Sequence, residues 1–309
     1  MSSRGSSAAS SSTASAGRQR SMETPPVRKL AELRATPHWS FSSLNTILNI
    51  CSLRWAFEKV YHAERESVSA SLPFGQAFHA AASLFALNKQ SGMDMTELEV
   101  QDAFSEWLRL ELSTAENLRL EDGESFDSLN GCGRKMVSAL MGGWRASQRV
   151  LGVSVAYSVP IVDASGNRVS ELPLIGESDV EVQDGEERLI VDWKTAARKW
   201  PDDKAGKDLQ PTCLLYAKSK TAHDGRKWLF RFDVVTKAKI PSLDSHYTIR
   251  GKDDYSRLAR LVMAVERVVN AEAFMPNEGG FLCGSCSYAC ACKAWHRKAA
   301  RQNFDLKAA

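Results

Sequence analysis

The stretch that most constrains the fold covers residues 176–195, GESDVEVQDGEERLIVDWKT. Its centre, Gln183-Asp184-Gly185-Glu186, contains an Asp-Gly step, the strongest short-range signal for a tight turn between two strands. The second strand has a fully apolar run that gives way to Asp192 and Lys194. Because side chains alternate along a strand, Asp192 and Lys194 share one face and Trp193 takes the other. We therefore expect a β-hairpin of a buried sheet, with charged groups at its open end.

Two carboxylates and an ammonium collect in this hairpin: Asp179 on the first strand, and Asp192 and Lys194 on the second. Charged groups at the rim of a buried sheet cost free energy unless they are paired, bind a metal or do chemistry. Mg²⁺ prefers oxygen ligands, and ions held by carboxylates can activate water and neutralise a phosphodiester during hydrolysis. Lys194 could orient the attacking water or offset charge on the phosphate. A solvated Asp–Lys pair is the alternative interpretation of the bare triplet.

The composition is that of an ordinary soluble globular protein, with 43% hydrophobic and 25% charged residues in 309. No apolar run approaches the ~20 residues that span a bilayer, and no signal peptide is evident, so we expect a cytoplasmic protein without a membrane partner. The net charge of +3 is unevenly distributed. Residues 94–131 hold eleven acidic and two basic side chains, whereas residues 188–239 hold thirteen basic and six acidic ones. The second region would attract a polyanion and the first would repel it.

Residues 1–36 are rich in Ser, Ala and Arg, which predicts a disordered tail; a transit peptide or a start codon farther downstream are the alternatives. Residues 37–309 are expected to form one domain. Hydrophobic periodicity predicts helices that begin near residues 40, 54 and 72, and two more at 95–120 and 132–150 in an acidic helical insertion (about 94–150). Strands are predicted at 153–162, 172–182 and 187–194, followed by a helix at 208–219, strands at 227–235 and 246–250, and a helix at 253–273. This order predicts a mixed α/β core with a helical insertion.

Four of the seven cysteines crowd into residues 283–292: Cys283, Cys286, Cys290 and Cys292. Without a secretory signal, such a cluster favours a metal site over disulfides. Dense thiolates select Zn²⁺ or an iron–sulfur cluster. The fourth ligand beside the C-x2-C-x5-C group could be Cys290 or the distant Cys51. The isolated Cys132 and Cys213 are expected in the core.

The motif Gly176-x-x-Asp179, followed by Asp192-Trp-Lys194, resembles the nuclease core of the PD-(D/E)XK superfamily, specifically its RecB-like branch. Two further marks of that branch occur in order. A G-x-x-x-H segment ending at His79 precedes the strands, and a Gln and a Tyr follow the lysine on the next helix. The resemblance implies a restriction-endonuclease-like mixed sheet flanked by helices, with the α-helical insertion and the cysteine-rich metal site added to it.

The resemblance also implies roles for individual residues. His79, Asp179, Asp192 and the carbonyl of Trp193 would bind Mg²⁺ or Mn²⁺, and Lys194 would be the catalytic lysine. Gln210 would line the catalytic site, and Tyr216 would contact DNA; Arg198 and Lys199, in the basic region, are further candidates for DNA contacts. The family usually places three residues between the Gln and the Tyr, whereas this chain has five. On an ideal helix the two then point about 240° apart, so we expect Gln210 rather than Tyr216 to face the site.

A subset of RecB-like nucleases, including AddB-type and CRISPR-adaptation nucleases, carries one N-terminal Cys and a C-terminal C-x2-C-x5-C around a 4Fe–4S cluster. This resemblance implies that Cys51, Cys283, Cys286 and Cys292 are the ligands. Zn²⁺ with Cys290 is the alternative.

Together these features predict a metal-dependent DNA nuclease, specifically an exonuclease on single-stranded DNA or DNA ends. The expected context is DNA repair, recombination or phage- and defence-related processing, with a helicase or recombination protein as a partner. The alternative is a non-catalytic DNA-binding or scaffold partner of a helicase–nuclease complex; a zinc-ribbon-type binding protein is a weaker one. The chain has no G-x-x-x-x-G-K-[ST] motif and is therefore not itself a P-loop motor.

Overall fold

The computed structural model describes residues 29–222, 224–280 and 282–305, with side chains of the last helix described as far as Lys298. Most of the predicted N-terminal tail therefore lies outside the described residues. Ordered structure nevertheless begins before the expected residue 37, because helix α1 forms at Leu30–Arg34 and buries Leu33.

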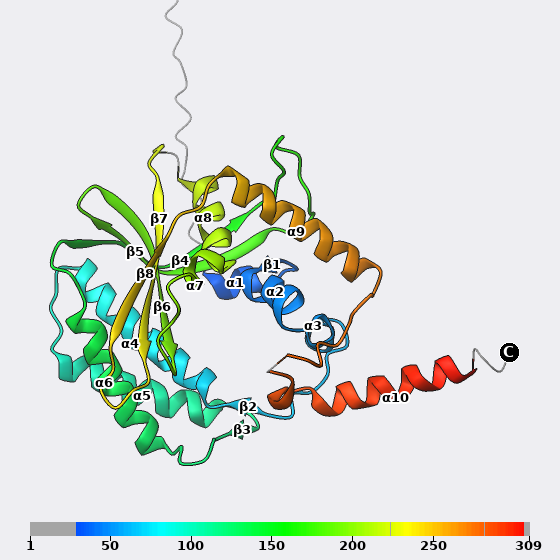
Figure 1. Cartoon of the computed structure of the whole chain (residues 1–309). Coiled ribbons are helices and arrows are strands. Elements are labelled where there is room, and N and C mark those ends of the chain that lie inside the picture. Colours follow the sequence, from blue (N-terminus) through cyan, green and yellow to red (C-terminus); the bar gives the residue numbers. More distant parts are fainter. Residues whose placement is uncertain (1–28, 223, 281, 306–309) are drawn as a thin grey trace, which may run out of the picture.

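A mixed six-stranded sheet forms the centre of the molecule (Figure 1). Its strands are β1 (Trp39–Ser40), β4 (Gln148–Val159), β5 (Leu174–Asp184), β6 (Glu187–Ala196), β7 (Trp228–Thr236) and β8 (Leu243–Thr248). The order is β1-β5-β6-β7-β8, and β4 pairs with the other edge of β5. The β4–β5, β5–β6 and β7–β8 pairs are antiparallel, which confirms the predicted three-stranded meander, whereas β1–β5 and β6–β7 are parallel. A small parallel pair, β2 (Val68–Ser69) with β3 (Leu118–Arg119), lies apart from the sheet.

The predicted hairpin is confirmed as β5 and β6. Its ladder closes at the pair Asp184 and Glu187, which leaves a two-residue loop of Gly185 and Glu186. Gly185 has φ +62°, in the left-handed region that glycine enters without strain. The Asp-Gly step therefore sets the register that aligns the functional residues of the two strands.

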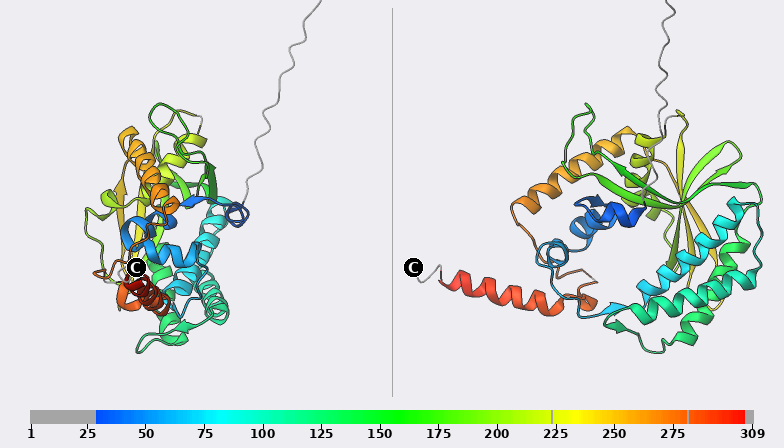
Figure 2. Two further views of the ribbon diagram at one scale, coloured as in Figure 1. Left: turned by 90° about the vertical axis from the view of Figure 1, so that its right-hand side faces the viewer. Right: turned by 180° about the vertical axis from the view of Figure 1, so that it is seen from behind.

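Helices cover both faces of this sheet (Figures 1 and 2). They are α2 (Phe41–Asn45), a π-helical turn (Thr46–Ile50), α3 (Ser52–Lys59), α4 (Ser71–Gln90), α5 (Glu97–Thr114), α6 (Phe126–Gly142), α7 (Lys204–Lys207), α8 (Gln210–Thr221), α9 (Lys252–Asn270), a 3₁₀ turn (Cys283–Ser285) and α10 (Ala289–Asp305). Helix α4 packs against one face, with α5 and α6 around it, and shares a core with Val191 and Trp193. Helix α8, with α9 outside it, covers the other face over Phe230 and Phe232.

The predicted acidic insertion is α5 and α6, and it differs from the prediction at its end. The second helix was expected to reach residue 150, but α6 ends at Gly142 and β4 begins at Gln148. Gly142 and Gly143 favour this ending, since glycine terminates helices readily. At Gly133 a Cβ atom would come within 1.9 Å of the Phe104 ring, so this glycine lets α6 pack closely on α5. The insertion thus belongs to the α4 core rather than forming a separate unit.

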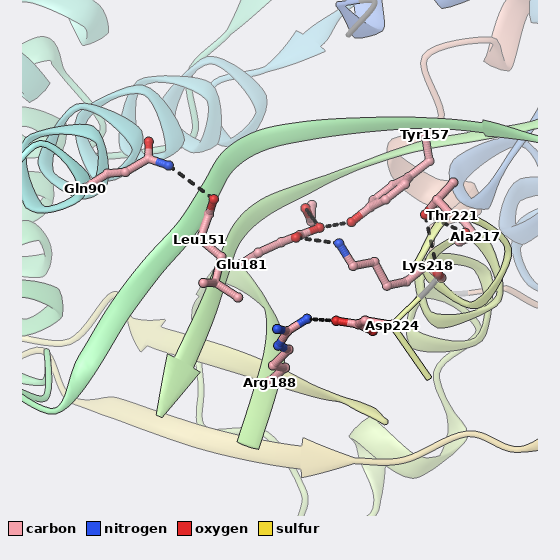
Figure 3. A network of polar contacts seen from close by, with 10 residues as sticks. Gln90, Leu151, Tyr157, Glu181, Arg188, Ala217, Lys218, Thr221 and Asp224 are labelled. Atoms are coloured by element: carbon pink, nitrogen blue, oxygen red, sulfur yellow. Dashed lines mark hydrogen bonds and ion pairs between the residues drawn. The ribbon is translucent and has the colours of Figure 1, made fainter. Parts of the chain in front are cut away.

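A buried polar network fastens α8 to the sheet (Figure 3). Lys218 Nζ on α8 lies 2.6 Å from Glu181 Oε2 on β5, and the Tyr157 hydroxyl of β4 donates a hydrogen bond to the same carboxylate. The side chains of Lys218 and Glu181 are only 13% and 6% exposed. Lys218 Nζ also lies 4.0 Å from the centre of the Trp228 ring. Buried charges require such complete pairing, so this network defines the rotation of α8 about its axis.

The C-terminal segment crosses back to the N-terminal helices before α10 extends away from the body of the molecule (Figure 1). Ser52 Oγ donates to the Met275 carbonyl at 3.1 Å, and Asn277 Nδ2 donates to the Ile50 carbonyl at 2.8 Å. These bonds bring the C-terminal cysteines to Cys51. Across the described residues, no helix combines the length and apolarity needed to cross a membrane.

Candidate active site

The candidate site lies where β5 and β6 separate. Their ladder ends at the pair Val180 and Val191; beyond it, β6 continues along β7, while the start of β5 pairs with β1. In the fork between them, Asp179 Oδ2 accepts a hydrogen bond from the backbone N–H of Trp193 at 2.7 Å. The carboxylate therefore satisfies a backbone donor that the ladder has left unpaired.

Helix α4 delivers His79 to this fork. His79 Nδ1 lies 3.1 Å from Asp179 Oδ1, and the imidazole meets the Trp193 ring edge-on with 6.3 Å between ring centres. The neighbouring Phe78 is fully buried, which fixes the face of α4 that points at the sheet. Burial opposes ionisation of both partners. The mutual attraction of His79 and Asp179 outweighs it, raising the pKa of the imidazole and lowering the pKa of the carboxyl.

Asp192 is the most buried ionisable group of the site, with 2% of its surface exposed. Gln210 Nε2 donates a hydrogen bond to Oδ1, and Lys194 Nζ lies 2.6 Å from Oδ2. The ammonium approaches without hydrogen-bond geometry, so Oδ2 is a buried acceptor without a hydrogen bond among the described residues. Burial, with a smaller contribution from the charge of Asp179, raises the pKa of Asp192 to about 6. Burial opposes the charge of Lys194, but the two aspartates outweigh it and raise the pKa of the ammonium.

The predicted alternation on β6 is confirmed. Lys194 Nζ lies 5.7 Å from the centre of the Phe232 ring, on the α8 face of the sheet, and Asp192 meets α8 through Gln210. Trp193 packs into the α4 core on the opposite face. Asp179 thus lies in the fork against the backbone of β6, and Asp192 lies on the α8 face of the sheet.

Gln210 occupies the first position of α8, and Pro211 follows it in the first turn, where proline is favoured. Its backbone N–H donates to Asp208 Oδ1 at 2.9 Å. The negative charge of Asp208 also contributes to the raised pKa of Lys194. Asp208 was not among the site residues predicted from the sequence, although an Asp that accepts the N–H two residues on is a common turn residue.

The structure does not bring Tyr216 to the site. Its side chain is 2% exposed, and its hydroxyl donates to the Pro160 carbonyl and accepts from the Val162 N–H, both at 2.9 Å. Leu214, which three residues separate from Gln210, stands at the position where the family has the tyrosine, and it packs over Gly176. A Cβ atom at Gly176 would come within 2.9 Å of Leu214 Cδ2. The motif glycine therefore allows α8 to lie close to β5, and Tyr216 braces the end of β4 instead of reaching DNA.

Two further predicted residues, Arg198 and Lys199, follow β6 and are exposed. Lys199 Nζ lies 3.4 Å from Asp244 Oδ1, a surface pair of little energetic weight. Glu177, which the sequence analysis passed over, is half-buried on β5 two residues before Asp179. Burial and the Asp179 charge raise its pKa.

His79, Asp179 and Asp192 could hold a divalent metal ion, although they do not stand at ligand spacing. Within residues 29–222, 224–280 and 282–305, no three His, Cys, Asp or Glu side chains are close enough to hold an ion as they are placed. The chemistry of the donors nevertheless fits Mg²⁺ or Mn²⁺: two carboxylates and one imidazole converge, and Asp192 Oδ2 is an acceptor that no hydrogen bond satisfies.

The cysteines form a second, separate cluster. Cys51, Cys283, Cys286 and Cys292 line one cavity of about 280 Å³, whereas Cys290 is exposed and is not part of its lining. Burial and the other three thiols raise the pKa of Cys292. The described residues place no three of these thiols at ligand spacing. Cys213 is buried in the core as predicted, and Cys132 is half-buried beside the α4 core.

Comparison with known proteins identifies the family. Residues 38–293 match the PD-(D/E)XK nuclease superfamily. The chain belongs to this superfamily. The mixed sheet flanked by helices is the fold that this membership leads one to expect, so the predicted fold class is confirmed.

One solved structure shows a similar fold. A crystal structure described as a "putative exonuclease" from Eubacterium rectale aligns with a TM-score of 0.51 and 14% identity, over 86% of this chain and 93% of that one. A structure described as SSO0001 aligns with a TM-score of 0.35 and 11% identity, over 82% of this chain and 95% of that one, and adds nothing to the argument. No curated protein sequence matches the chain.

The raised pKa of Asp192 predicts a pH dependence of metal binding. Its carboxyl takes up a proton as the pH falls through about 6, and a metal ion must displace that proton. The raised pKa of His79 acts in the same direction. We expect the Kd for Mn²⁺, measured by isothermal titration calorimetry, to be at least about tenfold higher at pH 5 than at pH 7. An equal Kd at the two pH values would contradict the assignment of Asp192 as a ligand.

Proposed function

We propose that this protein is a Mg²⁺- or Mn²⁺-dependent deoxyribonuclease that acts on single-stranded DNA or DNA ends. The observation that carries the proposal is the convergence of His79, Asp179, Asp192 and Lys194 on the fork between β5 and β6. Membership of the PD-(D/E)XK superfamily supports it.

Each side chain of the fork would have a separate role in hydrolysis. His79, Asp179 and Asp192 would hold the metal ion, with the Trp193 carbonyl as a further oxygen ligand. When bound, such an ion activates water and neutralises charge on the phosphate. The ammonium of Lys194 stays protonated and would stabilise charge that develops on the phosphate or orient the water. Gln210 holds the Asp192 carboxylate through Oδ1, and Oδ2, beside the Lys194 ammonium, is the oxygen that would bind the ion.

The choice of substrate rests on charge and on one comparison. Residues 188–239, which carry β6, α8 and β7, are strongly basic and include the exposed Arg198 and Lys199. Such residues favour phosphate contacts whose strength falls with salt concentration. The Eubacterium rectale structure is described as a "putative exonuclease", which favours an exonuclease here too. A repair, recombination or defence context with a helicase or recombination partner is part of the same proposal.

We also propose that Cys51, Cys283, Cys286 and Cys292 ligate a 4Fe–4S cluster, as in part of the RecB-like branch. These four thiols line one cavity, and Cys290 is outside it, which argues against the zinc alternative that uses Cys290. The cluster would tie α3 to the C-terminal segment, which hydrogen bonds from Ser52 and Asn277 already join.

The proposed chemistry predicts that Lys194→Ala lowers hydrolysis of single-stranded DNA with Mn²⁺ by about 10²-fold or more, because it removes the charged group beside the reacting phosphate. Lys252→Ala, on the exposed side of α9, is the matched control and should keep wild-type activity. Gel assays on end-labelled linear and on circular single strands measure this, and an exonuclease should spare the circles. Wild-type protein that binds DNA but cuts neither substrate would favour the non-catalytic scaffold alternative.

The proposed cluster predicts different effects for two cysteines. Cys51→Ser should abolish the brown colour and bound iron of anaerobically purified protein. It removes a ligand of the cluster and with it the link between α3 and the C-terminal segment. Cys290→Ser should keep both, since Cys290 lies outside the cavity. Visible absorption and metal analysis are the measurements. Colourless wild-type protein with one equivalent of zinc would contradict the cluster.

A further inference from the structure

Arg250, between β8 and α9, binds an unusual set of partners. Its Nη2 donates to three backbone carbonyls, those of Ala205 at 3.0 Å, Gly206 at 3.1 Å and Asp208 at 3.0 Å. Its Nε donates to Thr212 Oγ1 at 2.9 Å. Its Nη1 donates to the Ile249 carbonyl at 2.9 Å and to the Thr248 hydroxyl. Within the described residues, no carboxylate lies at ion-pair distance from this guanidinium, so its bonds go to neutral oxygens.

Four of these six bonds reach the junction of α7 and α8: the last turn of α7, Asp208 after it, and the first turn of α8. The carbonyls of Ala205 and Gly206 belong to the last turn of α7, where unpaired carbonyls carry partial negative charge. Thr212 lies in the first turn of α8 and is 3% exposed. Arg250 therefore ties the end of one helix to the start of the next; the segment between them is Asp208 and Leu209, and Gln210 follows as the first residue of α8.

A continuous series of contacts leads from Arg250 to the candidate metal ligand. Arg250 holds the backbone of Asp208, and the Asp208 carboxylate accepts the N–H of Gln210 at 2.9 Å. The amide of Gln210 in turn donates to Asp192 Oδ1, and Lys194 contacts Oδ2 of the same carboxylate at 2.6 Å. Any shift of the α7–α8 segment would therefore change the direction in which Asp192 presents its carboxylate oxygens.

We propose that Arg250 is a positioning residue of the nuclease site: its guanidinium holds the Asp208–Gln210 segment, which orients Asp192 toward the metal ion. The inference rests on the proposed metal-dependent nuclease function and adds a residue that touches neither metal nor DNA. Lys218 and Glu181 anchor α8 at its other half, so Arg250 supplies the constraint at the end that faces the chemistry. Partners of metal ligands of this kind typically contribute about 10–100-fold to metal affinity or activity.

The test compares Arg250→Lys with Arg260→Lys, an exposed arginine on α9. Lysine keeps the charge but cannot bind four carbonyls and two hydroxyls at once. For Arg250→Lys we expect kcat on single-stranded DNA to fall about tenfold or more and the Kd for Mn²⁺ to rise by a similar factor. KM for DNA should stay within about twofold, because the lost interaction orients the site and does not hold substrate. Arg260→Lys should match wild type in all three.

A double-mutant cycle separates positioning from a general loss of stability. If Arg250 acts through Gln210, then Arg250→Lys should have little further effect on Mn²⁺ affinity in a Gln210→Ala background. Thr212→Val removes one partner of the guanidinium without changing side-chain shape. It should show a smaller effect in the same direction, and it replaces Arg250→Lys in the test if that variant does not fold. A lower Tm with unchanged kcat and unchanged Mn²⁺ affinity would overturn the proposal, as would additive effects in the cycle. Wild-type protein that cuts no DNA would refute the proposed nuclease function. The role of Arg250 would still be decided by Mn²⁺ titration, because that measurement needs no turnover.

Discussion

The separation of β5 from β6 beyond Val180 and Val191 is the constraint on which the rest of the site depends. A continuous ladder would bury the edge of each strand and leave no room for an ion. Because the strands part, the Trp193 N–H needs another acceptor, and Asp179 supplies it. The same separation lets β1 pair with the start of β5 and opens a space that His79 enters from α4. The candidate catalytic residues thus lie at a local break in the central β-sheet.

Asp192 illustrates why the surroundings of the fork must be rigid. A carboxylate that is 2% exposed loses its solvation, and its pKa rises accordingly. Its ionised form can bind a cation from a defined direction only if Lys194 and Gln210 hold the carboxylate in one orientation. That orientation is built from α8, which Lys218 fastens to β5 in its second half and Arg250 fastens to α7 at its start. Side chains from several elements therefore stabilise the buried charge of Asp192 together.

Much of the site could be predicted because its signals are local or ordered along the chain. The Asp-Gly step, the apolar run before Asp192 and the alternation around Trp193 follow from strand geometry. The two-residue strand β1 has no periodicity and forms only because β5 offers it an edge. Tyr216 matched a motif by type but lies on another face of α8, since a helix converts two extra residues into a large rotation. Arg250 was beyond prediction because its partners are mostly backbone carbonyls, which leave no residue pattern.

The most direct test of the account is to locate the metal ion itself. Crystals grown with Mn²⁺ and measured at the manganese absorption edge should give an anomalous peak in the fork, within coordination distance of Asp179, Asp192 and His79. The account predicts that Asp192 Oδ2 contacts this peak and that Lys194 remains beside it. Strong manganese peaks elsewhere, with an empty fork in which Asp192 keeps its present contacts, would contradict the claim that the separated strands form a metal-dependent nuclease centre.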